Sequence, residues 1–180
     1  RMMDSAQHMG LDRLLVINQI DAVNADLPAL LARIREVFGK ECLPINLPAG
    51  NRTRVSDCYF APGGDADFSS VEQAHRELVE QVVEVDENLM ALYLEKGEVS
   101  PEELHEPLER ALREGHLIPV VFTSAKTGEG IAELLDVIVR LLPNPAEGNP
   151  PRYASTAFGE SGELTTVPDP SRHVVAQVFK

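Results

Sequence analysis

The chain has 180 residues, of which 43% are hydrophobic and 25% charged, a balance typical of a soluble globular protein with one ordinary core. The formal net charge of −13 argues against direct nucleic-acid binding, because such a surface does not neutralise phosphates. No apolar run approaches the roughly 20 residues of a membrane span, and the polar N-terminus does not resemble a signal peptide, so we expect a cytoplasmic protein.

The first third of the chain predicts a helix, a strand and a second helix. Residues 1–9 have a helical pattern that stops at Gly10, and residues 13–18 form an apolar run typical of a strand buried on both faces of a parallel sheet. Asn24 or Asp26 can cap the next helix, which carries apolar residues at helical spacing up to Phe38.

The middle of the chain predicts short strands followed by acidic helices. Residues 42–49 contain two prolines and suit an edge strand, and residues 54–60 are a further short strand. Ser69 or Ser70 can cap a helix whose apolar stripe runs from Val71 to Leu92. Residues 67–114 hold 14 Asp/Glu against 4 Lys/Arg, which indicates a solvated acidic face or a surface for a basic partner.

A further helix begins at the clearest start signal of the chain. Ser100 is followed by Pro101 and Glu103, the spacing of a capping box. Pro107 should kink this helix or restart it. Two cysteines, Cys42 and Cys58, sit among apolar neighbours without metal spacing, so we expect buried reduced thiols and no metal site.

The last third predicts a second buried strand at residues 117–122 and a helix at 131–142. A proline-rich linker follows, and the final residues, 173–180, form a strand-like run. The chain opens inside a helical pattern and closes on an unpaired strand, so we expect a fragment of a larger protein. All-apolar strands alternating with helices predict an α/β layer with a parallel sheet.

Polar residues follow both apolar strands, where open α/β sheets bind their ligands. The first strand delivers Asn18 and Asp21; the second delivers Ser124, Ala125 and Lys126. A carboxylate can accept the paired ring N–H and amine of guanine, and a turn N–H can donate to guanine O6. The motif Asn-x-x-Asp alone is expected about 0.4 times by chance in this composition, so its position after a strand carries the argument. The plainer interpretation, that these side chains only cap turns, weighs equally.

The residues around these strand ends resemble translational GTPases. "VINQIDAVNAD" is similar to their Asn-Lys-x-Asp motif, and "TSAKTGEGIAELLDVIVRLLPNP" to their fifth motif, the last helix of the GTPase domain and its exit. Between them, "LPINLPAG", "VEVDENLMALYLEKGEVSPEEL" and "ALREGHLIPVVFTSA" resemble the insertion of elongation factor G, and "HVVAQVFK" the first strand of the following barrel domain.

The resemblance implies an α/β fold with a partial P-loop-type GTPase sheet and a small α+β insertion subdomain. Its implied boundaries are 1–41 with 117–145 for the GTP-binding domain, 42–116 for the insertion, 146–171 for a linker and 172–180 for the first barrel strand. It also implies GTP or GDP as ligand and the ribosome, including its stalk, as partner. The insertion is short for elongation factor G, which favours an elongation factor G-like relative.

The resemblance also assigns roles to six residues, and no catalytic or metal-binding residue is among them. Asp21 would bind the guanine ring N–H and amine, while Asn18 would hold the base and brace the neighbouring loop. Ser124 and Ala125 would form the turn that contacts O6, with Lys126 beside the base. Gln19 stands where the family has lysine, so we expect weaker nucleotide affinity or altered selectivity.

The 180 residues contain no Gly-x-x-x-x-Gly-Lys-Ser/Thr loop and no Asp-x-x-Gly switch ahead of the first strand. Phosphoryl transfer and magnesium binding depend on those motifs, so we expect no GTP hydrolysis by this chain alone. Two other hypotheses remain: a non-catalytic acidic α/β module that binds a basic or ribosomal partner, and a small enzyme with an unrelated site. The five scattered histidines give the last hypothesis little support.

Overall fold

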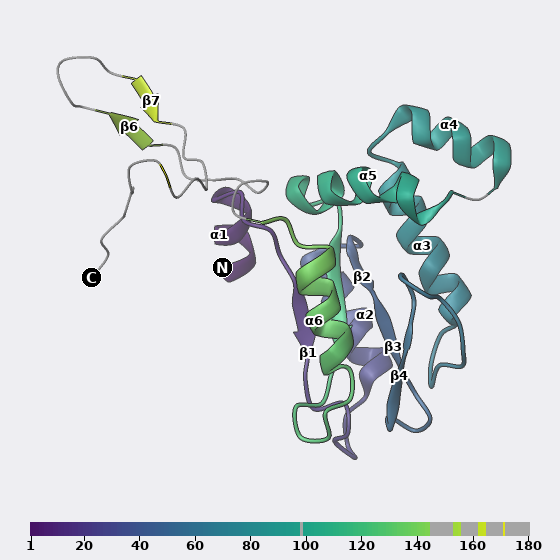
Figure 1. Cartoon of the computed structure of the whole chain (residues 1–180). Coiled ribbons are helices and arrows are strands. Elements are labelled where there is room, and N and C mark those ends of the chain that lie inside the picture. The colour runs from purple at the N-terminus through teal and green to yellow at the C-terminus, as the bar shows by residue number, and fades with distance from the viewer. Residues whose placement is uncertain (98, 145–152, 156–161, 165–170, 172–180) are drawn as a thin grey trace. The chain divides into compact units, whose positions relative to one another are not determined.

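A computed structural model describes residues 1–97, 99–144, 153–155, 162–164 and 171 (Figure 1). The chain divides into two compact units, Arg1–Leu142 and Pro143–Lys180. Among the described residues, no helix is long and apolar enough to cross a membrane.

The first unit contains six helices and five strands within the described residues. The helices are α1 (Met2–His8), α2 (Leu27–Phe38), α3 (Val71–Val83), α4 (Glu87–Lys96), α5 (Pro101–Glu114) and α6 (Ile131–Arg140). The strands are β1 (Leu15–Ile17), β2 (Cys42–Pro44), β3 (Asn46–Ala49), β4 (Arg54–Asp57) and β5 (Ile118–Phe122).

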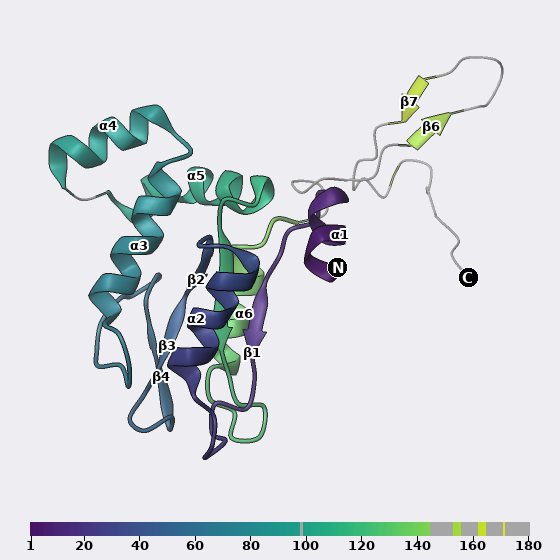
Figure 2. The same cartoon turned by 180° about the vertical axis from the view of Figure 1, so that it is seen from behind.

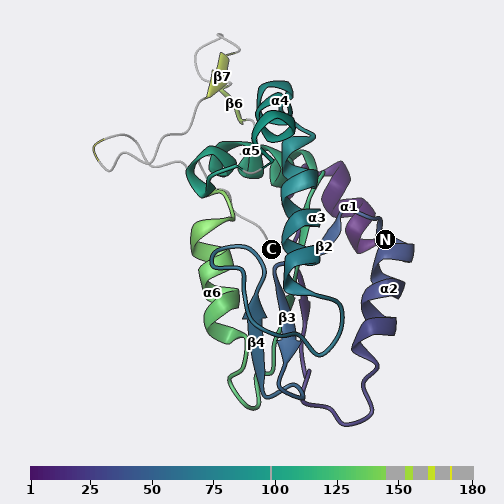
Figure 3. The same cartoon turned by 90° about the vertical axis from the view of Figure 1, so that its right-hand side faces the viewer.

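Strands β1, β5 and β2 form a parallel sheet in that order. All five residues of β5 are buried, as an apolar run in the middle of a parallel sheet requires. Helices α2 and α6 lie on opposite sides of the sheet, as Figure 3 shows, and contribute Leu27, Leu31 and Val137 to the core. The predicted α/β layer with a parallel sheet flanked by helices is confirmed.

Strand β1 departs from the prediction that it is buried on both faces. Only Ile17 of its three residues is buried, and the side chain of Val16 is 45% exposed. The reason lies in its position, since β1 pairs with β5 and forms one end of the described three-stranded sheet. An apolar run does not distinguish an edge strand from a central one.

The helix starts agree with the sequence. Asp26, and not Asn24, caps α2 by accepting a hydrogen bond from the backbone N–H of Ala29 at 3.0 Å. Ser70 caps α3, and Ser100 with Glu103 forms the expected capping box at the start of α5. These are local interactions, so residue type and spacing are sufficient to predict them.

The acidic stretch after Ser70 is two helices and not the single one predicted. α3 ends at Val83, and Asp86 starts α4 by accepting from the backbone N–H groups of Asn88 and Leu89 at 3.0 and 3.1 Å. The apolar stripe continues through the break because both helices contribute to the same core. The apolar pattern alone misses this break, because the capping carboxylate of Asp86 lies within an uninterrupted apolar stripe.

Pro107 does not restart α5, which runs continuously from Pro101 to Glu114 with the proline inside it. A proline removes one backbone hydrogen bond, but the buried side chains of Leu104, Leu108 and Ala111 hold both halves of the helix against the core. The cysteines are free and buried, as predicted, and burial raises the pKa of the Cys58 thiol to about 12.

Strand β2 lies at the end of the described parallel sheet opposite β1. The resemblance places residues from 42 onward in the insertion. Strands β3 and β4 follow as an antiparallel hairpin, with Asn46 opposite Asp57. Figures 1 and 2 show β3 and β4 beside the sheet, with α3 running along their outer side. The domain boundaries implied by the resemblance remain predictions.

The second unit contains an antiparallel pair, β6 (Tyr153–Ser155) and β7 (Gly162–Leu164). This pair lies within residues 146–171, which the resemblance implies to be a linker, and that boundary remains a prediction. The predicted barrel strand at 172–180 lies outside the described residues.

Candidate functional site

Two loops meet at the carboxyl ends of β1 and β5, because neighbouring parallel strands end at the same edge of their sheet. The pairing continues past the strands: the N–H of Thr123 donates to Ile17 at 2.8 Å, and that of Ile20 to Thr123 at 3.1 Å. Ile20 is fully buried and anchors the first loop. Figure 1 shows both loops together at the lower end of the sheet.

Asp21 lies at the centre of this corner. Its Oδ1 accepts a hydrogen bond from Ser124 Oγ at 2.6 Å, and Lys126 Nζ lies 3.9 Å from its Oδ2. The hydrogen bond from Ser124 lowers the pKa of Asp21 below its ordinary value of 3.8, with a smaller contribution from Lys126, against the desolvation that raises it. The carboxylate is 23% exposed, so an ionised acceptor faces solvent at neutral pH.

Asn18 connects the two loops. Its Oδ1 accepts from the backbone N–H of Ala125 at 3.0 Å and from that of Gln19 at 2.8 Å. Gln19 has a positive φ of 64°, a left-handed conformation that is uncommon for residues other than glycine. The Asn18 side chain therefore stabilises the tight turn at Gln19 in its own loop and also binds the N–H of Ala125 in the turn after β5.

The turn after β5 is organised by Ser124, which is fully buried. Besides donating to Asp21, its Oγ accepts from the N–H of Thr127 at 3.2 Å. Its backbone N–H donates to Glu129 at 2.7 Å, and its carbonyl accepts from Gly128 at 2.8 Å. With four hydrogen bonds made by one residue, the turn is rigid, which suits it for presenting a donor to a ligand.

The structure brings the six predicted residues together. Asn18 contacts Ala125, Asp21 contacts Ser124 and Lys126, and Gln19 binds the side chain of Asn18. Their assignment to a guanine ring remains a proposal, because these contacts are equally those of a well-capped pair of loops. Among the described residues, no group of three or more His, Cys, Asp or Glu could hold a metal ion.

Sequence reasoning missed two residues that contact this corner from the β3–β4 hairpin. Asn46 hydrogen-bonds the backbone of Phe122, and Arg52 hydrogen-bonds the loop that follows Asp21. Asn46 lies in the segment "LPINLPAG" but was given no role there, and Arg52 lies outside the quoted segments. Both residues are far in sequence from the groups they bind.

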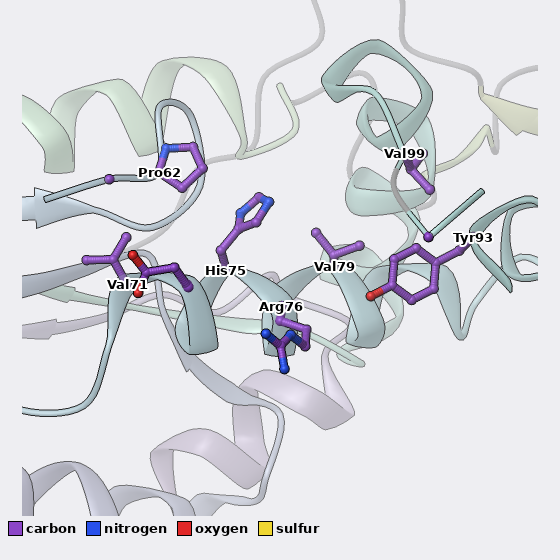
Figure 4. Close-up of a pocket in the computed structure, with 10 residues that line it drawn as sticks. Pro62, Val71, His75, Arg76, Val79, Tyr93 and Val99 are labelled. Atoms are coloured by element: carbon purple, nitrogen blue, oxygen red, sulfur yellow. The ribbon is translucent and has the colours of Figure 1, made fainter.

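A separate cavity of about 360 Å³ is lined by α3, by Pro62 and Gly63 in the segment after β4, and by residues from Tyr93 of α4 to Val99 (Figure 4). It is lined by His75, Arg76, Val79 and Tyr93 among others, and by none of the six predicted residues. The Nδ1 of His75 lies 2.9 Å from the carbonyl oxygen of Cys58, which fixes the ring orientation. This cavity is therefore distinct from the corner formed by the two loops.

Comparison with known proteins identifies the family. Residues 1–144 match the family described as elongation factor Tu GTP binding domain. The chain belongs to that family. A crystal structure of a protein from Thermus thermophilus has the same fold, with 32% sequence identity and a TM-score of 0.66 over 84% of this chain.

The match covers 25% of the Thermus thermophilus chain, so the present chain spans about a quarter of that protein's length. The translational GTPase family predicted from the sequence is confirmed, and membership implies guanine nucleotide binding in general terms. None of the six predicted residues lines the cavity of Figure 4, so the two strand-end loops and this cavity are separate, and the assignment of the loops to that nucleotide stays a prediction.

Proposed function

We propose that the two loops form the base-binding corner for GTP or GDP, with Asp21 reading guanine. The observation that supports it most directly is the geometry of Asp21, since Ser124 occupies one position on Oδ1 while the partly exposed carboxylate stays ionised. A carboxylate has about four acceptor positions, so enough remain for the ring N–H and amine of guanine. Adenine offers no such pair of donors and would leave the carboxylate unpaired, which costs on the order of 10⁴-fold in comparable sites.

Guanine O6 would bind the backbone N–H of Ala125 by replacing Asn18. In the structure Asn18 Oδ1, a carbonyl-type oxygen, accepts from that N–H at 3.0 Å. An amide oxygen and guanine O6 are the same class of acceptor, so the exchange conserves the hydrogen bond. The released Asn18 side chain would then hold the base and brace the neighbouring loop.

Gln19 and Lys126 would flank the base. Both side chains are exposed, and Lys126, whose Nζ lies 3.9 Å from Asp21, carries the cation that Gln19 lacks. A lysine stem and charge over an aromatic ring contribute about 0.5–1 kcal/mol at exposed sites. We therefore propose weaker binding than in a relative with lysine at position 19, partly offset by Lys126.

The wider role we propose is that of a cytoplasmic, ribosome-associated GTPase of the elongation factor G type. The order of the resembling segments supports it, as does an insertion rich in acidic residues that could meet the ribosomal stalk. Such a protein would couple GTP hydrolysis to translocation or ribosome remodelling. A non-catalytic acidic interaction module would instead give salt-sensitive ribosome association that changes at Asn18 and Asp21 leave intact.

The 180 residues themselves should not hydrolyse GTP, because they lack the phosphate-binding loop and switch motifs. Phosphate release by the purified chain with GTP and magnesium measures this directly. Turnover above a no-protein blank that disappears in Asp21→Asn would show that the chain supplies catalytic groups of its own.

The guanine assignment is tested by titrating the ¹⁵N-labelled chain with GMP and with AMP and following backbone amide shifts by NMR. We expect GMP, and not AMP, to shift the Ala125 amide as O6 replaces Asn18. Asp21→Asn should weaken GMP binding at least about tenfold, because the amide replaces an acceptor with a donor.

Asp26→Asn is the matched control. It removes the same charge five residues away and keeps a side chain that caps α2 well, so GMP binding should not change. Equal GMP affinities for the wild-type chain and Asp21→Asn would overturn the assignment.

A further inference from the structure

The turn of the β3–β4 hairpin contacts the loop that follows Asp21. Arg52 Nη1 donates to the carbonyl oxygen of Ala22 at 2.7 Å, and its Nη2 to that of Ala25 at 2.8 Å. One guanidinium thus bridges both ends of a four-residue loop 30 and 27 positions away in sequence. A planar fork with fixed donors is suited to holding two acceptors at a set separation.

The carboxylate of Asp67 holds the backbone of Arg52 in place. Asn51 and Arg52 have positive φ angles of 56° and 67°, a conformation that costs free energy for residues with a Cβ. Both oxygens of Asp67 compensate, accepting from the backbone N–H of Asn51 at 2.9 Å and of Arg52 at 2.7 Å. The N–H of Asp67 donates to Pro48 at 2.8 Å, which ties the carboxylate to strand β3.

The same hairpin is fastened to the second loop of the corner. The amide of Asn46, 1% exposed, donates through Nδ2 to the carbonyl of Phe122 at 3.1 Å and accepts through Oδ1 from its N–H at 2.7 Å. These two hydrogen bonds to Phe122 resemble those that a neighbouring strand would make with β5, and Phe122 lies two residues before Ser124. The hairpin therefore contacts both polypeptide segments that carry the predicted base-binding groups.

We propose that Arg52 is a positioning residue for guanine recognition, through which the hairpin sets the loop that carries Asp21. The proposal rests on the proposed function of the corner. Loop 22–25 begins immediately after Asp21, and its internal bonds are few: the N–H of Ala22 donates to Gln19, and that of Ala25 to Ala22. Releasing the two Arg52 bonds leaves the loop free to carry Asp21 away from Ser124 and from the base.

The test compares Arg52→Ala, Arg52→Lys and Arg54→Ala in the full 180-residue chain. Arg54 lies on the same hairpin, and its guanidinium donates to Ser56 Oγ at 3.5 Å. Arg54→Ala therefore removes the same charge from the hairpin and serves as the matched control. Two readouts are needed: amide hydrogen exchange at Ala22 and Ala25, which requires no nucleotide, and GMP affinity by NMR titration.

We expect Arg52→Ala to accelerate amide exchange in loop 22–25. It should also weaken GMP binding about three- to tenfold, because the loop loses one or two hydrogen bonds to a charged donor and then partly relaxes. Arg52→Lys should fall between, because an ammonium on a flexible stem reaches one carbonyl at a time. Arg54→Ala should match the wild-type chain in both measurements. Protected amides in β5 would show that each variant remains folded.

The outcomes separate the two proposals. Wild-type exchange and wild-type GMP affinity in Arg52→Ala would overturn the positioning role while leaving guanine recognition intact. A wild-type chain whose amides do not respond to GMP would overturn guanine recognition, and with it the role of Arg52 there. Faster exchange with unchanged GMP affinity would show that Arg52 holds the loop without serving the base, which also contradicts the proposal.

Discussion

Ser124 is the residue on which the chemistry of the corner depends most directly. Its hydroxyl donates to Asp21 and accepts from the N–H of Thr127, so it connects the carboxylate to the turn opposite. Because the pKa of Asp21 is lowered first by this hydrogen bond, Asp21 is ionised in the folded protein at every pH above about 3.8. The stability from this interaction is present above that pH and is lost as the pH falls through the lower folded-state pKa.

Ser124→Ala should raise the pKa of Asp21 toward its ordinary value. The measurement is the pH dependence of the Asp21 carboxyl ¹³C shift. Urea unfolding should show wild type more stable than the variant at neutral pH, with the difference shrinking below pH 3.8 as Asp21 protonates in both proteins. An unchanged Asp21 titration in Ser124→Ala would contradict the assigned cause.

Gln19→Lys should strengthen GMP binding about two- to fivefold, the effect of adding a cation over an aromatic ring at an exposed site. Stability should not change, since both unbranched side chains carry the same cost of the left-handed conformation at φ 64°. GMP titration and thermal unfolding of the two chains measure these effects. Gln19→Met, with a stem of similar length and no charge, is the control and should not gain affinity.

At the scale of elements, the join between β5 and α6 depends on two glycines with positive φ, 89° at Gly128 and 73° at Gly130. A Cβ at Gly130 would collide with the carbonyl oxygen of Phe122, whereas a Cβ at Gly128 would meet open space. The pair therefore separates the cost of a backbone conformation from the cost of a close approach.

Gly128→Ala should lower the free energy of unfolding by about 1–2 kcal/mol, the cost of the left-handed conformation alone. Gly130→Ala should lower it by clearly more, because the end of β5 must also move. Urea denaturation of both variants measures the difference. Equal losses would show that the close packing of α6 on β5 relaxes without cost.

Elements that depend on local interactions were predictable from sequence, and those that depend on their neighbours were not. The caps at Asp26, Ser70 and Ser100 each follow from a side chain and the N–H group three residues away. The exposure of Val16 depends on which strands flank β1, which no apolar run encodes. The break between α3 and α4 could have been predicted from the cap at Asp86, but the apolar stripe runs through it without interruption and indicates a single helix.

The candidate site divides in the same way. Five residues of the two loops were predicted because they follow recognisable strands, and the resemblance to translational GTPases added Gln19. Asn46 and Arg52 act through tertiary contacts with backbone groups, and Asn46 binds a residue 76 positions away. Every residue has a backbone carbonyl, so the sequence does not indicate which carbonyl such a side chain binds. Residues that hold a loop in place through its main chain are therefore the ones that motif reasoning omits.

For the whole molecule, the net charge of −13 predicts a stability that rises with salt. The excess is concentrated in residues 67–114, where like charges repel across α3, α4 and α5. Raising the ionic strength from about 0.01 to about 0.15 M shortens the Debye length from about 30 to about 8 Å. We expect the Tm to rise by about 2–4 °C, equivalent to roughly 1 kcal/mol.

Calorimetry in sodium chloride and in choline chloride measures this effect and separates screening from specific cation binding. Glu84→Lys, at the exposed carboxyl end of α3, should raise the Tm at low salt and reduce the response to salt. A Tm independent of ionic strength in both proteins would show that the acidic helices are spaced widely enough to avoid repulsion.

The hydrogen bonds that join the β3–β4 hairpin to the two loops also limit how the hairpin can be replaced by protein engineering. Excising the hairpin would leave both main-chain groups of Phe122 without the Asn46 amide and two carbonyls of loop 22–25 without Arg52. A chimera that grafts a foreign insertion here must therefore bring its own equivalents of both side chains. The hairpin therefore cannot be exchanged without replacing the hydrogen bonds that join it to both loops.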